Sequence, residues 1–204
     1  MTSPDSPRFR VHPSPVGDIL IVTTHEGIVT LHPFDGPLGA ELERVSLALR
    51  AVPVPDDEGA DAAASAIFNA AITQLDEYFD GDRRSFDLEL DWRLVRGFTR
   101  DALEAVREIP YGETAGYGEV AIAAGSPRAA RAVGTACATT PFSIVVPVHR
   151  VVRADGSLGE YGGRPDVKKY LIDLERPAGA EVPERPARVQ GPARVAERER
   201  PAGV

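Results

Sequence analysis

The sequence Ile109-Pro110-Tyr111-Gly112-Glu113-Thr114, followed by Tyr117-Gly118-Glu119-Val120-Ala121, decides the fold of the C-terminal half. Pro110-Tyr111-Gly112 is a turn signal, and it closes a helix predicted over residues 98–109 from apolar residues at helical spacing. A second, short helix is predicted over 117–124, ending at Gly125. We therefore expect a mostly helical region from Trp92 onward.

A turn then leads into another helix. Ser126-Pro127 is the sequence of an N-cap followed by a first-turn proline, and it predicts a helix over 128–138. Two short helices joined by a Gly-Ser-Pro turn have the outline of a helix-turn-helix. Many paired helices only pack together, so this pattern alone is a weak indication of DNA binding.

Upstream of Trp92 the pattern includes strands. Residues 18–24 and 28–31 predict a β-hairpin. An acidic, proline-containing loop at 53–59 leads into a helix predicted over 61–79, and the alternation at 86–90 predicts an exposed or edge strand.

The predicted fold class is α+β. An N-terminal α+β domain is expected over residues 1–91 and a mostly helical C-terminal domain over 92–177. Residues 178–204 are rich in Pro, Ala, Arg and Glu with almost no large apolar residues. Such a segment cannot bury a core, so we expect it to be disordered.

The composition is that of a globular protein in a reducing compartment. Of 204 residues, 43% are hydrophobic and 26% charged, which suffices to bury a core. The single cysteine excludes an intramolecular disulfide. The first 15 residues lack the apolar stretch of a signal peptide, and no apolar run approaches the ~18 residues of a membrane span. The expected localisation is cytoplasmic.

The net charge of −8 is unevenly distributed. Residues 1–91 hold 6 Lys or Arg against 17 Asp or Glu, whereas residues 92–177 hold 12 against 10. An acidic chain repels phosphate overall, but local arginines decide docking. The histidines, His12, His25, His32 and His149, are scattered, and no Cys/His cluster has zinc spacing, so no metal site is expected.

The motifs at 109–121, with those at 128–134, 144–152 and 155–158, resemble the O6-alkylguanine-DNA alkyltransferase family. The likeness covers residues 92–176 and extends more weakly upstream through 75–81. It implies an N-terminal ribonuclease H-like α/β domain, a C-terminal domain with a helix-turn-helix, and a monomer without cofactors. It also implies that the ligand is double-stranded DNA carrying O6-alkylguanine.

The resemblance fails at one decisive position. The family has Pro-Cys-His-Arg, whose cysteine takes the alkyl group, whereas this chain has Pro147-Val148-His149-Arg150. His149 and Glu175 match the family's activating network, but the valine side chain has no lone pair with which to displace guanine. No catalytic residue is therefore expected, and His149 and Glu175 are interpreted as structural residues that hold the turn by hydrogen bonding. A valine engineered in place of cysteine is a second explanation of this position.

The DNA-reading residues of the family have counterparts here. Tyr117 matches the tyrosine that helps rotate the nucleotide, and Arg131 matches the arginine that fills the gap in the base stack; Ser126 and Arg128 lie on the same motif. Tyr161, Gly162 and Gly163 match the loop that lines the base pocket, together with Val148.

Two further residues, Thr140 and Cys137, are expected in the base pocket. Thr140-Pro141 stands where most members have Asn-Pro, which removes the amide that braces the active-site turn. Cys137 carries the only thiol of the chain, and in the relatives the residue at its position faces the base pocket. It is interpreted as a packing residue, with a displaced alkyl acceptor as the alternative.

Three functions follow, and the first is preferred. The chain resembles alkyltransferase-like proteins, which flip and hold O6-alkylguanine without repairing it and signal nucleotide excision repair, so that excision repair proteins are further partners. The second is an active methyltransferase that uses Cys137. The third is a degenerate scaffold without selective DNA binding. Relatives of the first kind usually carry tryptophan at the position of Val148. The smaller valine suggests either room for bulkier adducts or weaker binding.

Overall fold

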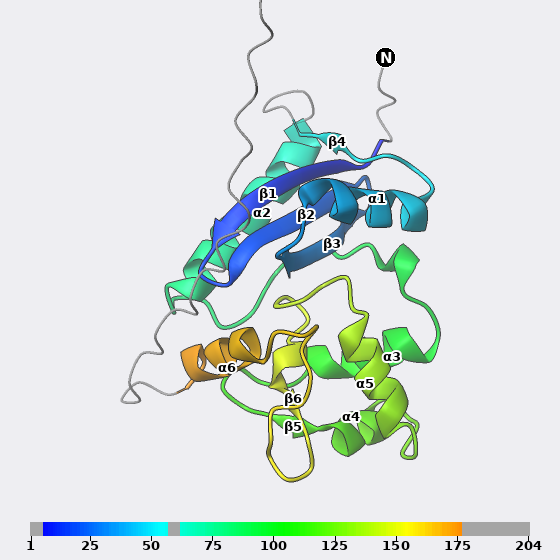
Figure 1. Ribbon diagram of the computed structural model, residues 1–204, viewed down its shortest axis with the longest axis vertical. Helices are drawn as coiled ribbons and strands as arrows, with labels where there is room; N and C mark the ends of the chain where they lie inside the picture. Colours follow the sequence, from blue (N-terminus) through cyan, green and yellow to red (C-terminus); the bar gives the residue numbers. More distant parts are fainter. Residues whose placement is uncertain (1–5, 57–61, 177–204) are drawn as a thin grey trace, which may run out of the picture.

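The computed structural model describes residues 6–56 and 62–176. A sheet with two helices forms one unit, and a mainly helical unit lies beneath it (Figure 1). This mixed architecture confirms the predicted α+β class. Within the described ranges, no helix combines the length and the apolar character that crossing a membrane requires. The disorder predicted for 178–204 concerns residues outside the described part.

A four-stranded sheet forms the N-terminal unit. Its strands are β1 (Arg8–Ser14), β2 (Gly17–Thr24), β3 (Gly27–Phe34) and β4 (Val54–Pro55). They lie in the order β3-β2-β1-β4, with β4 parallel to β1 and the other neighbours antiparallel. The predicted hairpin is confirmed as β2 and β3, both longer than expected, whereas β1 was not predicted.

The two faces of this sheet are covered by different helices. These are α1 (Leu38–Leu49) and α2 (Ala62–Phe79), of which α2 matches the helix predicted from spacing. Successive side chains of a strand point to opposite faces. Accordingly, Ile21 packs in a core with Phe68 of α2, and its neighbour Val22 packs in another core with Val45 of α1. The apolar spacing that predicts α1 was overlooked in the sequence.

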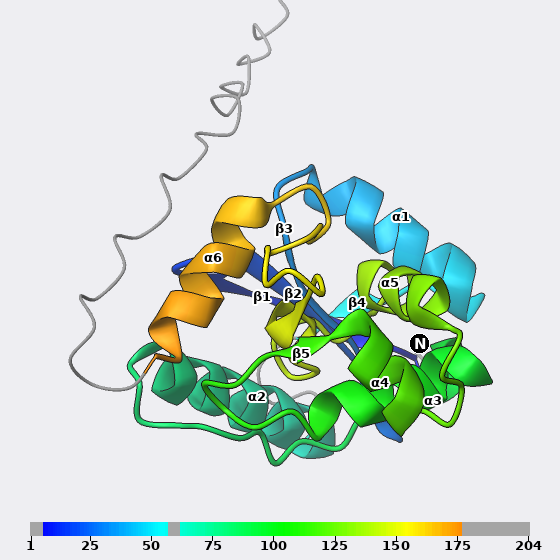
Figure 2. The same cartoon turned by 90° about the horizontal axis from the view of Figure 1, so that it is seen from below.

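The C-terminal unit consists of short helices around a second core. Its elements are the 3-10 helix η1 (Trp92–Leu94), α3 (Phe98–Arg107), β5 (Ala115–Gly116), α4 (Tyr117–Ala123), α5 (Ala130–Ala138), the 3-10 helix η2 (Val148–Arg150), β6 (Val151–Val152) and α6 (Pro165–Leu174). Seen from below, α4 and α5 lie beside each other, with α3 next to them (Figure 2). The apolar residues Leu103, Val120, Val133 and Val148 share one core.

The last helix belongs to the other core. Val167 and Leu171 of α6 are fully buried with Phe68 and Leu75 of α2 and with Ile144 of the preceding loop. The two units therefore share apolar packing. Helix α6 was not predicted from the sequence.

Two local predictions were wrong. Residues 86–90 do not form a strand, because their backbone pairs only at the end, where Ile28 N donates to Glu89 O at 2.9 Å and Asp91 N to Ile28 O at 2.8 Å. Ser126 is not the N-cap of the following helix. Ala129 N donates to Ser126 O at 2.9 Å in a separate turn, and α5 begins only at Ala130.

The hairpin turn depends on Gly27. Its φ of +130° lies in the region that glycine favours, and a Cβ there would lie 2.5 Å from the carbonyl oxygen of Glu89. We expect Gly27→Ala to lower the free energy of unfolding by about 2 kcal/mol or more, measured by urea denaturation. Gly118→Ala in α4 is the control, because a Cβ there meets nothing within 4 Å. A Gly27→Ala protein as stable as the control variant would contradict this account.

Candidate functional site

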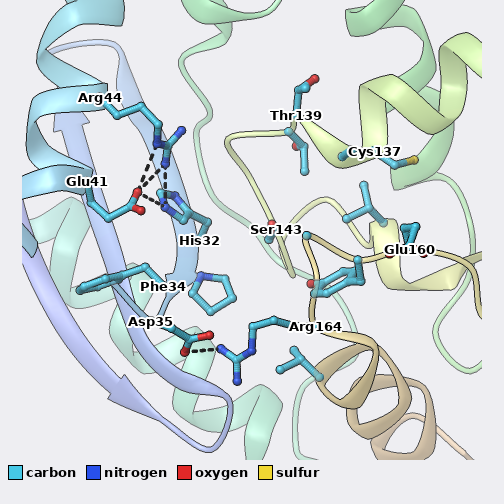
Figure 3. Close-up of a pocket in the computed structure, with 17 residues that line it drawn as sticks. His32, Phe34, Asp35, Glu41, Arg44, Cys137, Thr139, Ser143, Glu160 and Arg164 are labelled. Carbon is cyan, nitrogen blue, oxygen red and sulfur yellow. Dashed lines mark hydrogen bonds and ion pairs between the residues drawn. The ribbon is translucent and has the colours of Figure 1, made fainter. Parts of the chain in front are cut away.

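A cavity of about 470 Å³ lies between the two units. Figure 3 shows its opposite walls, with Cys137, Ser143 and Glu160 on the C-terminal side and His32 and Arg44 on the N-terminal side. The full lining is His32, Pro33, Phe34, Asp35, Glu41, Arg44, Cys137, Ala138, Thr139, Thr140, Ser143, Val148, Glu160, Tyr161, Gly162, Arg164 and Val167.

The structure brings most of the predicted pocket residues together. Val148, Cys137, Thr140, Tyr161 and Gly162 all line this cavity. The predicted Gly163 is not among its lining residues; it is exposed, with a φ of +80°.

Val148 occupies a tightly held loop. It is 3% exposed and begins the 3-10 helix η2, directly before His149. Upstream, Val146 N donates to Phe142 O at 2.8 Å, and the buried Ile144 has a φ of +75°. A β-branched residue in that region is strained, and such strain persists only where the surroundings impose it. The loop that presents Val148 is thus fixed by its packing.

A buried polar network lies directly behind this loop. His149 Nε2 lies 2.8 Å from Glu175 Oε1, which also accepts a hydrogen bond from the Tyr78 hydroxyl at 2.7 Å. Arg150 donates to both oxygens of Glu175, at 2.8 and 2.9 Å, and to Ile109 O at 2.6 Å. His149 Nδ1 is buried without a partner among the described residues. The predicted pairing of His149 with Glu175 is therefore present in the structure.

The network fixes the charges of its members. Burial lowers the pKa of His149, against the opposing effect of Glu175, so the imidazole is neutral near pH 7. Burial alone would raise the pKa of Glu175, but hydrogen bonds from His149 and Arg150 outweigh it and lower that pKa to about 2. Burial raises the pKa of Tyr78, which therefore keeps its proton. A neutral histidine beside a carboxylate is the arrangement of a general base.

Cys137 is close to this site but is not activated. Burial raises the pKa of its thiol to about 12, and the positive charge of Lys168 only partly opposes this. Lys168 is itself fully buried, and its ammonium donates to Val151 O at 2.5 Å. Near pH 7 the sulfur is therefore a thiol, which is a poor nucleophile.

Thr140 braces its turn more locally than an amide would. Its hydroxyl oxygen accepts one hydrogen bond, from Phe142 N at 3.2 Å. The Tyr161 hydroxyl is buried without a hydrogen-bond partner among the described residues, and this burial raises its pKa.

The predicted DNA-reading residues lie on α4, α5 and the turn between them. Tyr117 begins α4 and is half-buried, and a Cβ placed on Gly159 would lie 3.0 Å from its hydroxyl. Arg128 and Arg131 are exposed, and their side chains form no ion pair within the described residues. Ser126 is half-buried in the preceding turn.

The N-terminal wall of the cavity was not predicted from the sequence. Arg44 donates to Glu41 Oε2 at 2.7 Å, and His32 Nε2 lies 3.0 Å from the same oxygen and 2.9 Å from Arg44. Burial lowers the pKa of His32. Below this cluster, Arg164 donates to Asp35 at 2.7 Å and so ties the loop before α6 to the end of β3 (Figure 3). The i,i+3 spacing of Glu41 and Arg44 was the available signal.

Metal ligands are not clustered in the parts of the chain that the structure describes. Within residues 6–56 and 62–176, no three His, Cys, Asp or Glu side chains are grouped so that they could hold a metal ion.

Comparison with known proteins gives the family. The model of the 6-O-methylguanine DNA methyltransferase ribonuclease-like domain matches residues 8–92, and that of its DNA binding domain matches residues 97–177. A methylated-DNA–protein-cysteine methyltransferase of Methanosarcina acetivorans is 35% identical over 167 residues, 82% of this chain and 97% of that protein. The chain belongs to the 6-O-methylguanine DNA methyltransferase family. The family is one of DNA-binding alkyltransferases, as the resemblance indicated.

Two mycobacterial members of the family are also similar. A methylated-DNA–protein-cysteine methyltransferase of Mycolicibacterium paratuberculosis is 50% identical over 109 residues, which are 53% of this chain and 66% of that relative. The alignment thus spans just under two thirds of the relative. The crystal structure of Mycobacterium tuberculosis OGT in complex with DNA matches with a TM-score of 0.66 and 36% identity, over 84% of this chain and 96% of that one.

The buried ion pair makes a strong prediction about stability. Glu175→Ala leaves the Arg150 guanidinium buried without its carboxylate, so we expect a loss of about 3–5 kcal/mol in the free energy of unfolding. Glu104→Ala removes an exposed partner of Arg100 and is expected to cost about 1 kcal/mol or less. Urea denaturation at pH 7.5 measures both variants. Equal losses would show that the buried pair is not special.

The pKa directions also predict how stability depends on pH. The folded pKa of His149 lies below its ordinary 6.5, so the unfolded chain binds a proton there that the folded chain refuses, and stability falls as the pH drops below about 6.5. Glu175 adds a further loss between about pH 4.5 and 2. We expect His149→Phe to flatten the decline between pH 7.5 and 5.5, measured by urea denaturation across that range. Identical slopes for wild type and His149→Phe would contradict this assignment.

Proposed function

We propose that this protein binds double-stranded DNA at O6-alkylguanine, flips the base into the cavity and holds it without accepting the alkyl group. The single observation that carries the proposal is Val148, which lines the cavity beside His149 at the position that the resemblance assigns to the acceptor cysteine. The bound complex then signals nucleotide excision repair. In this proposal the protein acts as a cytoplasmic monomer without a cofactor.

The chemistry at Val148 supports binding without transfer. In transfer, a sulfur lone pair forms a bond to the alkyl carbon while the bond from that carbon to guanine O6 breaks. A valine side chain has no lone pair and no ionisable proton. His149 and Glu175 are nevertheless paired at 2.8 Å, so the loop retains its hydrogen bonds around a position that cannot react.

The proposed binding step uses α4, α5 and the turn between them, which belong to the C-terminal unit together with Val148. Rotating a base out of the duplex costs a few kcal/mol, which a wedge residue and a fitting pocket offset. Arg131, exposed on α5, is the proposed wedge, and Tyr117 is proposed to crowd the rotating phosphate. Arg128 and Ser126 lie in the adjoining turn, where they are proposed to contact the backbone.

Alkyl transfer to Cys137 is the second candidate. The observation in its favour is that Cys137 lines the same cavity as Val148. Its thiol, however, has a pKa raised to about 12, which leaves almost no thiolate at pH 7. Binding without transfer is therefore the better-supported function.

The first experiment compares a duplex containing one O6-methylguanine with its undamaged twin, at near-physiological salt, followed by intact-mass analysis of the protein. We expect selective binding with unchanged mass, weakened by Arg131→Ala because the wedge is lost. Arg100→Ala on α3 is the matched control for removing an exposed arginine. A mass gain of one methyl group would identify Cys137 as an acceptor. Equal, weak binding to both duplexes would leave only a scaffold without selective DNA binding.

Restoring the nucleophile tests the position of Val148 directly. We expect Val148→Cys to gain one methyl group in mass from the damaged duplex, because His149 Nδ1 has no partner within the described residues and can take the thiol proton. Val151→Cys, one turn further along the same segment, is the control and should stay unmodified. An unreactive Val148→Cys protein that still binds the lesion would remove Val148 from the acceptor position.

Adduct size is a separate test of the valine-lined pocket. Valine leaves more space than tryptophan, so benzyl and larger O6 adducts should bind at least as tightly as methyl. Val148→Trp should reverse this order. Affinity that falls steadily with adduct size in the wild-type protein would count against a widened pocket.

A further inference from the structure

A second cavity, of about 360 Å³, lies on the reverse side of the loop that presents Val148. Ser143 and Val148 line the first cavity, whereas Ile144, Pro147 and Arg150 line the second. Its remaining lining comes from Val145 of the same loop, from residues 84–86 after α2, and from residues 107–111 at the end of α3 and in the turn that follows it. Neither the proposed base binding nor the His149 network uses this space.

Two arginines at this cavity lack a counter-charge. The guanidinium of Arg84 lies 5.6 Å from the ring centroid of Tyr111, and within the described residues it has no hydrogen bond or ion pair. Arg107, in the last turn of α3, likewise has none there. By contrast, the nearby Arg83 is paired with Glu77 and Arg100 with Glu104. Two unpaired cations beside one cavity are notable in a chain of net charge −8.

The third arginine of the cavity is already occupied. Arg150 donates to Glu175 and to Ile109 O, so its position and charge are committed to the network behind Val148. Among the described residues that line the cavity, Glu108 is the only acidic one, so Arg84 and Arg107 leave the cavity with a net positive charge. A bound anion is the simplest complement.

We propose that this cavity binds a phosphate group, which Arg84 and Arg107 hold from two sides. The two arginines come from separate segments that line the same cavity. A guanidinium fork binds phosphate bidentately, and the oxygens of a phosphate accept from more than one donor. The phosphate belongs either to the backbone of bound DNA or to a free phosphate compound. Only the DNA source rests on the proposed function.

The first arm of the test uses inorganic phosphate as the probe. Isothermal titration calorimetry at low ionic strength should show that the wild-type chain binds phosphate. The double variant Arg84→Gln, Arg107→Gln should bind phosphate at least about tenfold more weakly. Arg100→Gln, which removes an arginine from the same helix but outside the cavity, should bind phosphate like the wild type. Urea denaturation confirms that the variants are folded.

The second arm uses an undamaged duplex, so that it does not depend on lesion recognition. If the ligand is a backbone phosphate, the slope of log affinity against log salt concentration should be less steep by about 1 for the double variant. Arg100→Gln should leave this slope unchanged. A change in either arm supports the phosphate site and identifies its source. No change in both arms overturns it, even if lesion binding is found. A wild-type protein that binds phosphate at this cavity but does not distinguish damaged from undamaged DNA would overturn only the proposed function.

Discussion

The rest of the site depends on the hydrogen bonds that the carboxylate of Glu175 accepts. It accepts hydrogen bonds from Tyr78 near the end of α2 and from Arg150 in η2, and Gly112 N donates to it at 3.2 Å. These groups come from three segments far apart in the chain. Because a buried carboxylate and guanidinium are each costly when unpaired, the segments are stable only in this one arrangement. The position of His149 follows from it.

That dependence separates the shape of the site from its reactivity. The loop that carries Val148 is held by the hydrogen bond between His149 and Glu175 behind it and by the apolar core in which Val146 and Val148 are both buried, and neither requires a reactive side chain at position 148. A valine fits this core as a buried apolar residue. The proposed function therefore requires an intact, prearranged pocket that can hold the base. It does not require the alkyl transfer for which such pockets are otherwise used.

The sequence predicted those parts of the structure that depend on local pattern. The β2–β3 hairpin and α2 were found because alternation and helical spacing reflect which face is buried. The segment 86–90 alternates in the same way, yet only its end pairs with Ile28, and pattern cannot reveal whether a neighbouring strand is present. The cluster of His32, Glu41 and Arg44 depends on how α1 packs over β3, which spacing alone does not give.

The burial of α6 among residues of α2 has a consequence for modularity. The two family models divide the chain between residues 92 and 97, but Val167 and Leu171 complete a core whose other members, such as Phe68 and Leu75, lie before that division. A fragment ending at residue 92 would expose this apolar surface to water and tend to self-associate. The two halves are thus not interchangeable: recombination between relatives would have to exchange α6 together with the N-terminal residues whose core it completes.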